Sequence, residues 1–129
     1  MLIIQHRPHD GGLPYWLLPG GGSEGEETPE ACVVREVSEE TNLRIRVLKF
    51  LRDEPDIPGG AYDRLHTYLC EAIGGEAVPG YEPEEDAAQE YLISAVDWLN
   101  LQDRTKWDEI GLDGFSRGIV TRIAEQLGY

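Results

Sequence analysis

Three glutamates lie close together near the end of a predicted helix. Glu36 precedes Glu39 by three residues and Glu40 by four, and such spacings bring side chains together on a helical surface. Their repulsion destabilises a helix by roughly a few tenths of a kcal/mol per pair, and the helix dipole disfavours anions in the last turn. A hard divalent cation, which prefers oxygen ligands, would offset this repulsion. The cluster therefore indicates a metal site, although a solvated acidic helix face would explain the same short pattern.

The residues around the three glutamates form a longer pattern. Gly21 is followed after five residues by Glu27, and after seven more by Arg35-Glu36-Val37-Ser38-Glu39-Glu40-Thr41-Asn42-Leu43. This stretch resembles the Nudix box, Gly-x5-Glu-x7-Arg-Glu-U-x-Glu-Glu-x-Gly-U, where U is a bulky aliphatic residue. Asn42 replaces the last glycine of the box, and Asn is the next-best residue for a left-handed helix end. The box covers Gly21 to Leu43, and the family fold would account for the whole chain.

The resemblance implies a role for each box residue. The metal-binding carboxylates would be Glu36, Glu39 and Glu40, and the backbone near Gly21 would add a further oxygen. Arg35 and Glu27 resemble the pair that orients these carboxylates. Members of the family often take another acidic ligand from the loop before the last core strand. Glu85, six residues ahead of Tyr91, is favoured over Glu82 and Glu84, and a solvated loop acid is the alternative for each.

The resemblance also implies an activity. It is the metal-dependent hydrolysis of a pyrophosphate bond in a nucleoside diphosphate linked to another moiety, with Mg²⁺ or Mn²⁺ as cofactor. Nucleoside triphosphates, ADP-ribose-like compounds and dinucleoside polyphosphates are the candidate substrates. Glu36 is the first choice for the base that accepts the proton of the attacking water, with Glu39, Glu84 and Glu85 as alternatives. Two rival hypotheses are a nucleotide-sensing Nudix-like domain that does not cut, and an acidic Ca²⁺-binding or interaction module.

Three further residues are candidate substrate contacts. Arg7 ends the first predicted strand, where it could meet a phosphate or a base. Trp16 and Tyr62 could stack on a base. The ordinary alternative for Arg7 is a surface charge, and the ordinary alternative for the two aromatic residues is packing in the core. Pro58 resembles a feature of the ADP-ribose branch, whereas Tyr62 resembles one of the diadenosine polyphosphate branch. These two indications conflict, so the substrate stays open.

Composition and charge limit the kinds of molecule that the protein is expected to bind. The chain has 25 acidic and 11 basic side chains, a net charge of −14, which disfavours nucleic acid polymers and anionic membranes. A phosphorylated small molecule would need cations between it and the protein. The two cysteines, Cys32 and Cys70, are expected to be reduced thiols, with no cluster suited to zinc. The apolar start is too short for a signal peptide or a membrane span, so a cytoplasmic protein is expected.

The elements that must position these residues follow from apolar periodicity and turn residues. Thr28 is a good N-cap and Pro29 suits the first helical position, so the box helix is predicted to run to about Thr41. The order of elements predicts one domain, 1–129, of α/β (α+β) class, and the resemblance implies a mixed sheet between helices. The other expected elements are strands at Leu2–Arg7, Tyr15–Leu18, Arg44–Arg52, Tyr62–Ile73 and Tyr91–Val96, loops at Asp53–Gly60 and Val78–Ala88, and helices at Asp97–Leu101 and Phe115–Leu127.

The first expected strand raises a question about the sheet edge. Family members usually have another strand before the one that ends here in Gln5-His6-Arg7. Either that strand is missing or the edge is built differently. A missing strand would expose an edge, which a second subunit could cover in a homodimer.

Overall fold

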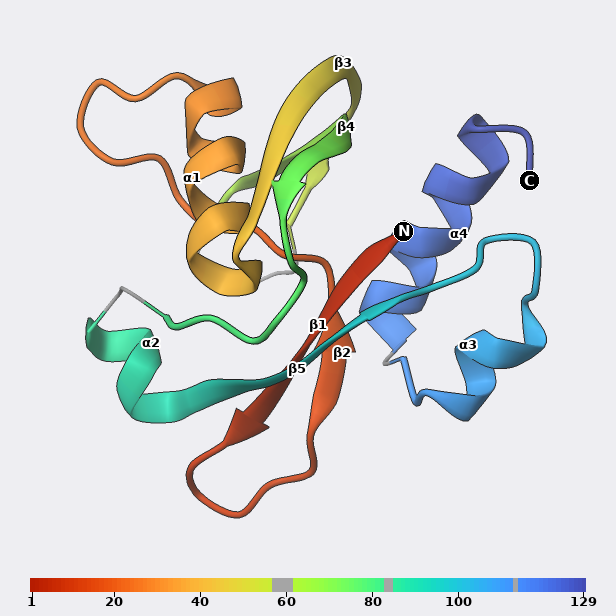
Figure 1. Cartoon of the computed structure of the whole chain (residues 1–129). Helices are drawn as coiled ribbons and strands as arrows, with labels where there is room; N and C mark the ends of the chain where they lie inside the picture. The colour runs from red at the N-terminus through yellow and green to blue at the C-terminus, as the bar shows by residue number, and fades with distance from the viewer. Residues whose placement is uncertain (57–61, 83–84, 113) are drawn as a thin grey trace.

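The computed structural model describes residues 1–56, 62–82, 85–112 and 114–129 (Figure 1). The strands form two antiparallel sheets, one ordered β2-β1-β5 and the other β3-β4. Among the described residues, one isolated bridge, between Trp16 and Leu112, is parallel. The strands are β1 (Leu2–Pro8), β2 (Tyr15–Leu17), β3 (Leu43–Pro55), β4 (Arg64–Gly75) and β5 (Tyr91–Trp98).

Helices cover both sides of the sheets, with α1 on one side and α3 and α4 on the other (Figure 1). This combination confirms the α+β class. No described helix is long and apolar enough to cross a membrane. The helices are α1 (Pro29–Thr41), α2 (Glu85–Glu90), α3 (Thr105–Glu109) and α4 (Gly114–Gln126).

The helix α1 begins and ends where its capping residues predict. The Thr28 hydroxyl accepts a hydrogen bond from the Ala31 amide at 3.1 Å, and Pro29 follows as the first helical residue. Asn42 closes the helix in the left-handed conformation with φ of 62°, and its amide donates to the Ser38 carbonyl at 3.0 Å. Asparagine therefore closes the helix in the left-handed conformation that the usual glycine also adopts readily.

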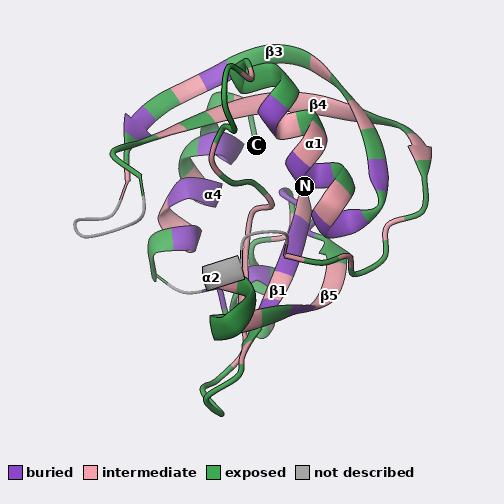
Figure 2. Ribbon diagram, turned by 90° about the vertical axis from the view of Figure 1, so that its left-hand side faces the viewer, coloured by how far each residue is buried: buried purple, intermediate pink, exposed green. Residues whose placement is uncertain are grey.

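The core lies on both faces of β1. Ile3 is buried in a cluster with Trp107 of α3 and Val120 of α4, and its neighbour Ile4 is fully buried as well. Successive strand residues point to opposite faces, so helices or loops must cover the sheet on each side. Figure 2 shows buried segments on β1 and on parts of α1 and α4. A second cluster packs Ile123 of α4 against Leu51 of β3.

The central position of β1 answers the question about its edge. β1 pairs with β2 on one side and with β5 on the other. Among the described strands, the free edges of this sheet therefore belong to β2 and β5, not to β1. The homodimer stays a prediction.

Three expected boundaries are wrong. β3 extends through Pro55, where Glu54 pairs with Leu65 and is anchored by Arg122 of α4. The expected loop at 78–88 contains the start of α2, whose sequence is rich in helix formers. Asp97 does not cap a helix, because it belongs to β5 and pairs there with Ile3 of β1. Its carboxylate accepts a hydrogen bond from the Trp98 amide at 2.7 Å.

Candidate active site

The glycine-rich loop before α1 lies directly on two of the box carboxylates. Glu36 and Glu40 are 2% and 1% exposed, one helical turn apart on the inner face of α1. The Gly20 amide donates to Oε1 of Glu40 at 2.8 Å. A Cβ atom at Gly21 would collide with the carboxylate of Glu36, so any other residue here would displace that carboxylate from its position.

Arg35 holds the box together. Its guanidinium makes a two-pronged contact with Glu27, with Nε donating at 2.8 Å and Nη2 at 2.9 Å. Nη1 donates to Glu36 and to Glu39, at 3.0 Å each. Nη2 also donates to the Gly22 carbonyl at 3.0 Å. The structure thus brings the predicted orienting pair beside the predicted carboxylates, with a geometry that a planar guanidinium fork favours.

Burial and mutual repulsion disfavour the charged forms of the two inner carboxylates. Burial raises the pKa of Glu36 to about 7, against the lowering effect of Arg35. Burial raises the pKa of Glu40 to about 8, with Glu36, Glu82 and Glu39 adding to the shift and the Gly20 amide opposing it. Among the described residues, no basic side chain forms an ion pair with Glu40. Two buried carboxylates in this state form a site where a cation would be stabilising.

A second loop docks on the end of α1 and carries an acid to the same place. The last carbonyls of a helix have no partner within the helix. Here the amides of Val78, Gly80 and Tyr81 donate to the carbonyls of Thr41, Glu40 and Glu39, at 3.0, 2.8 and 3.0 Å. A Cβ atom at Gly80 would collide with the Glu39 carbonyl oxygen, so the close approach requires glycine.

Glu82 is the described candidate among the three loop acids. It follows the docked segment, and its charge raises the pKa of both Glu36 and Glu40. Its Oε2 accepts a hydrogen bond from the Tyr91 hydroxyl at 2.8 Å. Of the other two candidates, Glu84 and the side chain of Glu85 lie outside the described residues.

The donors fit a hard divalent cation in their chemistry, although they are not arranged around a common point. In the part of the chain that the structure describes, no three acidic, imidazole or thiol groups converge as a metal site. The Nη1 of Arg35 bridges Glu36 and Glu39 instead. Cation binding to both would therefore require Arg35 to release at least one of them, while its contact with Glu27 could persist. The carbonyl of Gly21 lies 3.6 Å from the thiol of Cys32.

The three predicted substrate contacts lie in different places. Tyr62 lies beside the box loop, since a Cβ atom at Gly22 would come within 2.8 Å of its ring. Trp16 packs against the core cluster around Trp107. Arg7 is exposed, and the alternation of β1 places it on the face of Ile3, opposite to His6. The structure brings only Tyr62 to the box.

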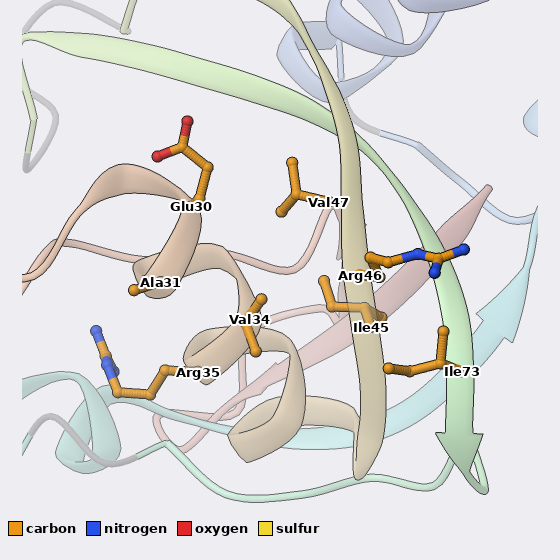
Figure 3. A pocket seen from close by; sticks show the side chains of 8 residues that line it. All are labelled: Glu30, Ala31, Val34, Arg35, Ile45, Arg46, Val47 and Ile73. Carbon is orange, nitrogen blue, oxygen red and sulfur yellow. The ribbon is translucent and has the colours of Figure 1, made fainter.

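Two hollows lie near α1 and β5. One, of about 520 Å³, runs between α1 and the β3–β4 hairpin, and Figure 3 shows its apolar wall. Of the box residues singled out above, only Arg35 lines it. The other, of about 450 Å³, includes Tyr91, the partner of Glu82. The first is lined by Glu30, Ala31, Val34, Arg35, Ile45, Arg46, Val47 and Ile73, and the second by Pro8, Asp10, Tyr15, Gln89, Glu90 and Tyr91.

Sequence reasoning missed three residues around the site. The sequence pattern places Gly80 in a loop and Tyr91 in a strand, and it gives His6 no functional role. A glycine within an acidic loop can mark a place where the backbone approaches another element closely. This signal could have identified Gly80. Nothing in the linear spacing connects His6 or Tyr91 to the box, because β1 and β5 are far apart in sequence.

Comparisons with known proteins match most of the chain to one family. The family model for the NUDIX domain matches residues 1–115. The chain is 37% identical over 126 residues to the NAD-capped RNA hydrolase NudC of Photorhabdus laumondii, covering 97% of this chain and 41% of that protein. It is 30% identical over 114 residues to the putative nudix hydrolase 1 of Caenorhabditis elegans, covering 88% and 27%. The chain thus spans less than half the length of these curated relatives.

Solved structures show the same fold. A MutT NUDIX hydrolase from Burkholderia pseudomallei matches with a TM-score of 0.65 at 26% identity, over 98% of this chain and 86% of that one. An ADP-ribose pyrophosphatase from Streptococcus suis matches with a TM-score of 0.66 at 21% identity, over 98% and 78%. The expected Nudix fold is therefore confirmed. With the family model matched across most of the sequence and the box folded around Arg35, the chain belongs to the Nudix hydrolase family.

Proposed function

We propose that the chain hydrolyses a pyrophosphate bond in a nucleoside diphosphate linked to another moiety, with Mg²⁺ or Mn²⁺ as cofactor. The observation that carries the proposal is the pair of buried carboxylates, Glu36 and Glu40, enclosed by the glycine loop. No basic side chain in the described part of the chain pairs with Glu40. Such a pair is costly for folding alone. A nucleotide sensor would not need this pair, and no observation favours that alternative.

Four acids would hold the cofactor: Glu36, Glu39 and Glu40 of α1, with Glu82 from the docked loop. The bound ions supply charge neutralisation at the phosphates and an activated water. In the ion-free state, Arg35 holds Glu36 and Glu39 in place while Glu27 fixes the guanidinium from behind. At least one of the two glutamates would leave Arg35 when the ions bind. We assign acceptance of the water's proton to Glu36 or Glu39, which share Nη1 of Arg35.

The substrate class is a small nucleotide. A net charge of −14 disfavours long contacts with a nucleic acid backbone, although a relative named as an NAD-capped RNA hydrolase makes a dinucleotide with an internal pyrophosphate the first compound to examine. Tyr62 beside Gly22 is the proposed aromatic contact. The hollow beside Tyr91 carries acids, Asp10 and Glu90, so it suits an uncharged part of the substrate rather than a phosphate.

The test is turnover of a panel of pyrophosphates with Mg²⁺ or Mn²⁺, followed by chromatography of the nucleotide products. The panel contains NAD, NAD-capped RNA, ADP-ribose, diadenosine polyphosphates and nucleoside triphosphates including 8-oxo-dGTP. Hydrolysis of any member between two phosphorus atoms is the expected result. Nucleotide binding without turnover of any compound would contradict the proposal and favour a sensor.

Glu40→Gln is the matched variant for this test. It keeps the size of the side chain and removes the charge, so turnover is expected to fall by at least about a hundredfold. The melting temperature of the metal-free protein should be unchanged or higher, because a buried carboxylate is lost. Wild-type turnover in a folded Glu40→Gln variant would exclude the metal assignment.

A further inference from the structure

Tyr91 is the residue that contacts the loop acid from the sheet. It is the first residue of β5, and its hydroxyl donates to Oε2 of Glu82 at 2.8 Å. Burial and the neighbouring Glu82 raise the pKa of Tyr91 above its usual range. The phenol is therefore a neutral donor, and a hydrogen bond to a carboxylate is stronger than one between neutral groups.

His6 and Tyr15 restrict the ring of Tyr91. The imidazole of His6, on the neighbouring strand β1, stacks on Tyr91 with ring centres 3.8 Å apart and planes inclined by 14°. Burial lowers the pKa of His6 to about 4, so the stacked ring is neutral. Tyr15 of β2 lies edge-on to His6 with ring centres 5.4 Å apart, and its hydroxyl is 3.3 Å from Nδ1 of His6. One residue from each strand of the first sheet thus forms a continuous aromatic row.

Glu82 is consequently fixed from two directions. The main chain just before it is docked on α1 through the amides of Gly80 and Tyr81. Its carboxylate is held by the hydroxyl of Tyr91. Loop docking positions the main chain at Glu82, and the hydrogen bond to the ring of Tyr91 restricts the side-chain torsions as well.

We propose that Tyr91, held by the stacked ring of His6, is the positioning residue that fixes the carboxylate of Glu82 beside Glu36 and Glu40 for cation binding. The inference rests on the proposed function. Tyr91 does not touch the reacting atoms in this arrangement. It acts through Glu82, as a residue behind a ligand does when it sets the direction of that ligand.

The test is a titration of the full chain with Mn²⁺ alone, by calorimetry, for the wild type and Tyr91→Phe. The variant keeps the ring and its stack on His6 and removes only the hydroxyl. Losing a hydrogen bond to a charged group is expected to weaken Mn²⁺ binding by about tenfold. Turnover at low Mn²⁺ should fall in parallel and should recover when Mn²⁺ is raised. Tyr68→Phe is the control, since the hydroxyl of Tyr68 makes no hydrogen bond within the described residues.

A double-mutant cycle with Glu82→Gln separates positioning from a general effect on folding. Tyr91→Phe is expected to cause no further loss of Mn²⁺ affinity once Glu82 is neutral. Unchanged affinity in Tyr91→Phe, or full additivity of the two losses, would overturn the inference. If Tyr91→Phe melts too early to titrate, Glu82→Asp withdraws the carboxylate from the hydroxyl by one methylene and should show the same loss. Absence of wild-type turnover would count against the proposed function, while the Mn²⁺ titrations would still decide this inference.

Discussion

At the scale of single residues, the site depends on two glycines as much as on its charged side chains. Gly21 and Gly80 allow two loops to lie against Glu36 and the Glu39 carbonyl, where any side chain would collide. Arg35 then distributes its donors among Glu27, Glu36 and Glu39. Close approach and charge pairing therefore act together, since the loops bury the carboxylates that the guanidinium partly compensates.

Asn42 offers a prediction about the helix end. Asn42→Gly restores the residue usual at this box position, and both residues tolerate φ of 62°. The free energy of unfolding should stay within about 1 kcal/mol of the wild type, and activity should be retained. Asn42→Val, which is strained in the left-handed region, should lose about 1–3 kcal/mol in urea denaturation. Equal stability of the two variants would contradict the capping role.

His6 gives a prediction about pH. Its pKa is lowered from 6.5 to about 4 by burial, so the unfolded chain takes up a proton at higher pH than the folded protein does. Burial of the neutral imidazole therefore contributes fully to the free energy of unfolding above pH 6.5, and this contribution is lost as the pH falls toward 4. Tyr91 stacks on a face of His6, and the charge of Glu82 lies beyond Tyr91. The hydroxyl of Tyr15 lies 3.3 Å from Nδ1 of His6, and the two rings are edge-on to each other.

His6→Phe keeps an aromatic ring and should therefore lose less stability between pH 7 and pH 5 than the wild type does. Urea unfolding at the two pH values measures the difference. His66→Phe is the control, because the side chain of His66 is 45% exposed. The same loss in wild type and His6→Phe would show that other groups cause the acid sensitivity.

At the scale of elements, the C-terminus of α1 joins the two loops of the site. Its last carbonyls accept amides from the segment 78–81, which would otherwise have no reason to follow the helix end. The same helix places Glu36 and Glu40 one turn apart on its inner face. The element thus supplies both the box carboxylates and the platform for the loop that carries Glu82.

Gly80→Ala tests this platform. The added methyl group would collide with the Glu39 carbonyl oxygen, so the loop must move away and leave helix carbonyls without donors. We expect a loss of about 1–3 kcal/mol in stability and a weaker response to Mn²⁺. Gly114→Ala is the control, since nothing lies within 4 Å of its added methyl group. Wild-type stability and Mn²⁺ binding in Gly80→Ala would show that the docking is not needed.

At the scale of the whole molecule, α1 and α4 lie on opposite sides of the sheets (Figure 1). On the α4 side, the buried acid Glu54 of β3 joins the strand to the helix. It accepts hydrogen bonds from Arg122 of α4 at 2.7 Å and from Arg52 at 2.6 Å. These donors lower the pKa of Glu54. Every acid assigned to the site lies on the α1 side instead, where the balance of charge is negative.

Metal binding should therefore stabilise the whole molecule. A ligand that binds only the folded state adds about 2.7 kcal/mol at a hundred times its dissociation constant. The melting temperature is expected to rise with Mn²⁺ concentration and to return to its starting value on addition of EDTA. Glu40→Gln should show a much smaller rise. A melting temperature independent of Mn²⁺ in the wild type would contradict a structural contribution of the metal.

The sequence by itself determined the box, the helix that carries it, and both helix caps. The helix and its caps depend on contacts between residues three or four positions apart, which spacing and residue type specify directly. Even the pairing of Arg35 with Glu39 is a contact between neighbouring turns.

Only the tertiary structure decided that the charge of Glu82 acts on the box carboxylates, that Trp16 packs against the core, and that Arg7 lies on the other face of β1. It also brought His6 and Tyr91 together through the pairing of β1 with β5. These placements depend on strand order, register and the approach of glycine-rich loops, which join residues many positions apart. Linear spacing does not encode such neighbours, because each is set by how the buried surfaces of several elements fit together.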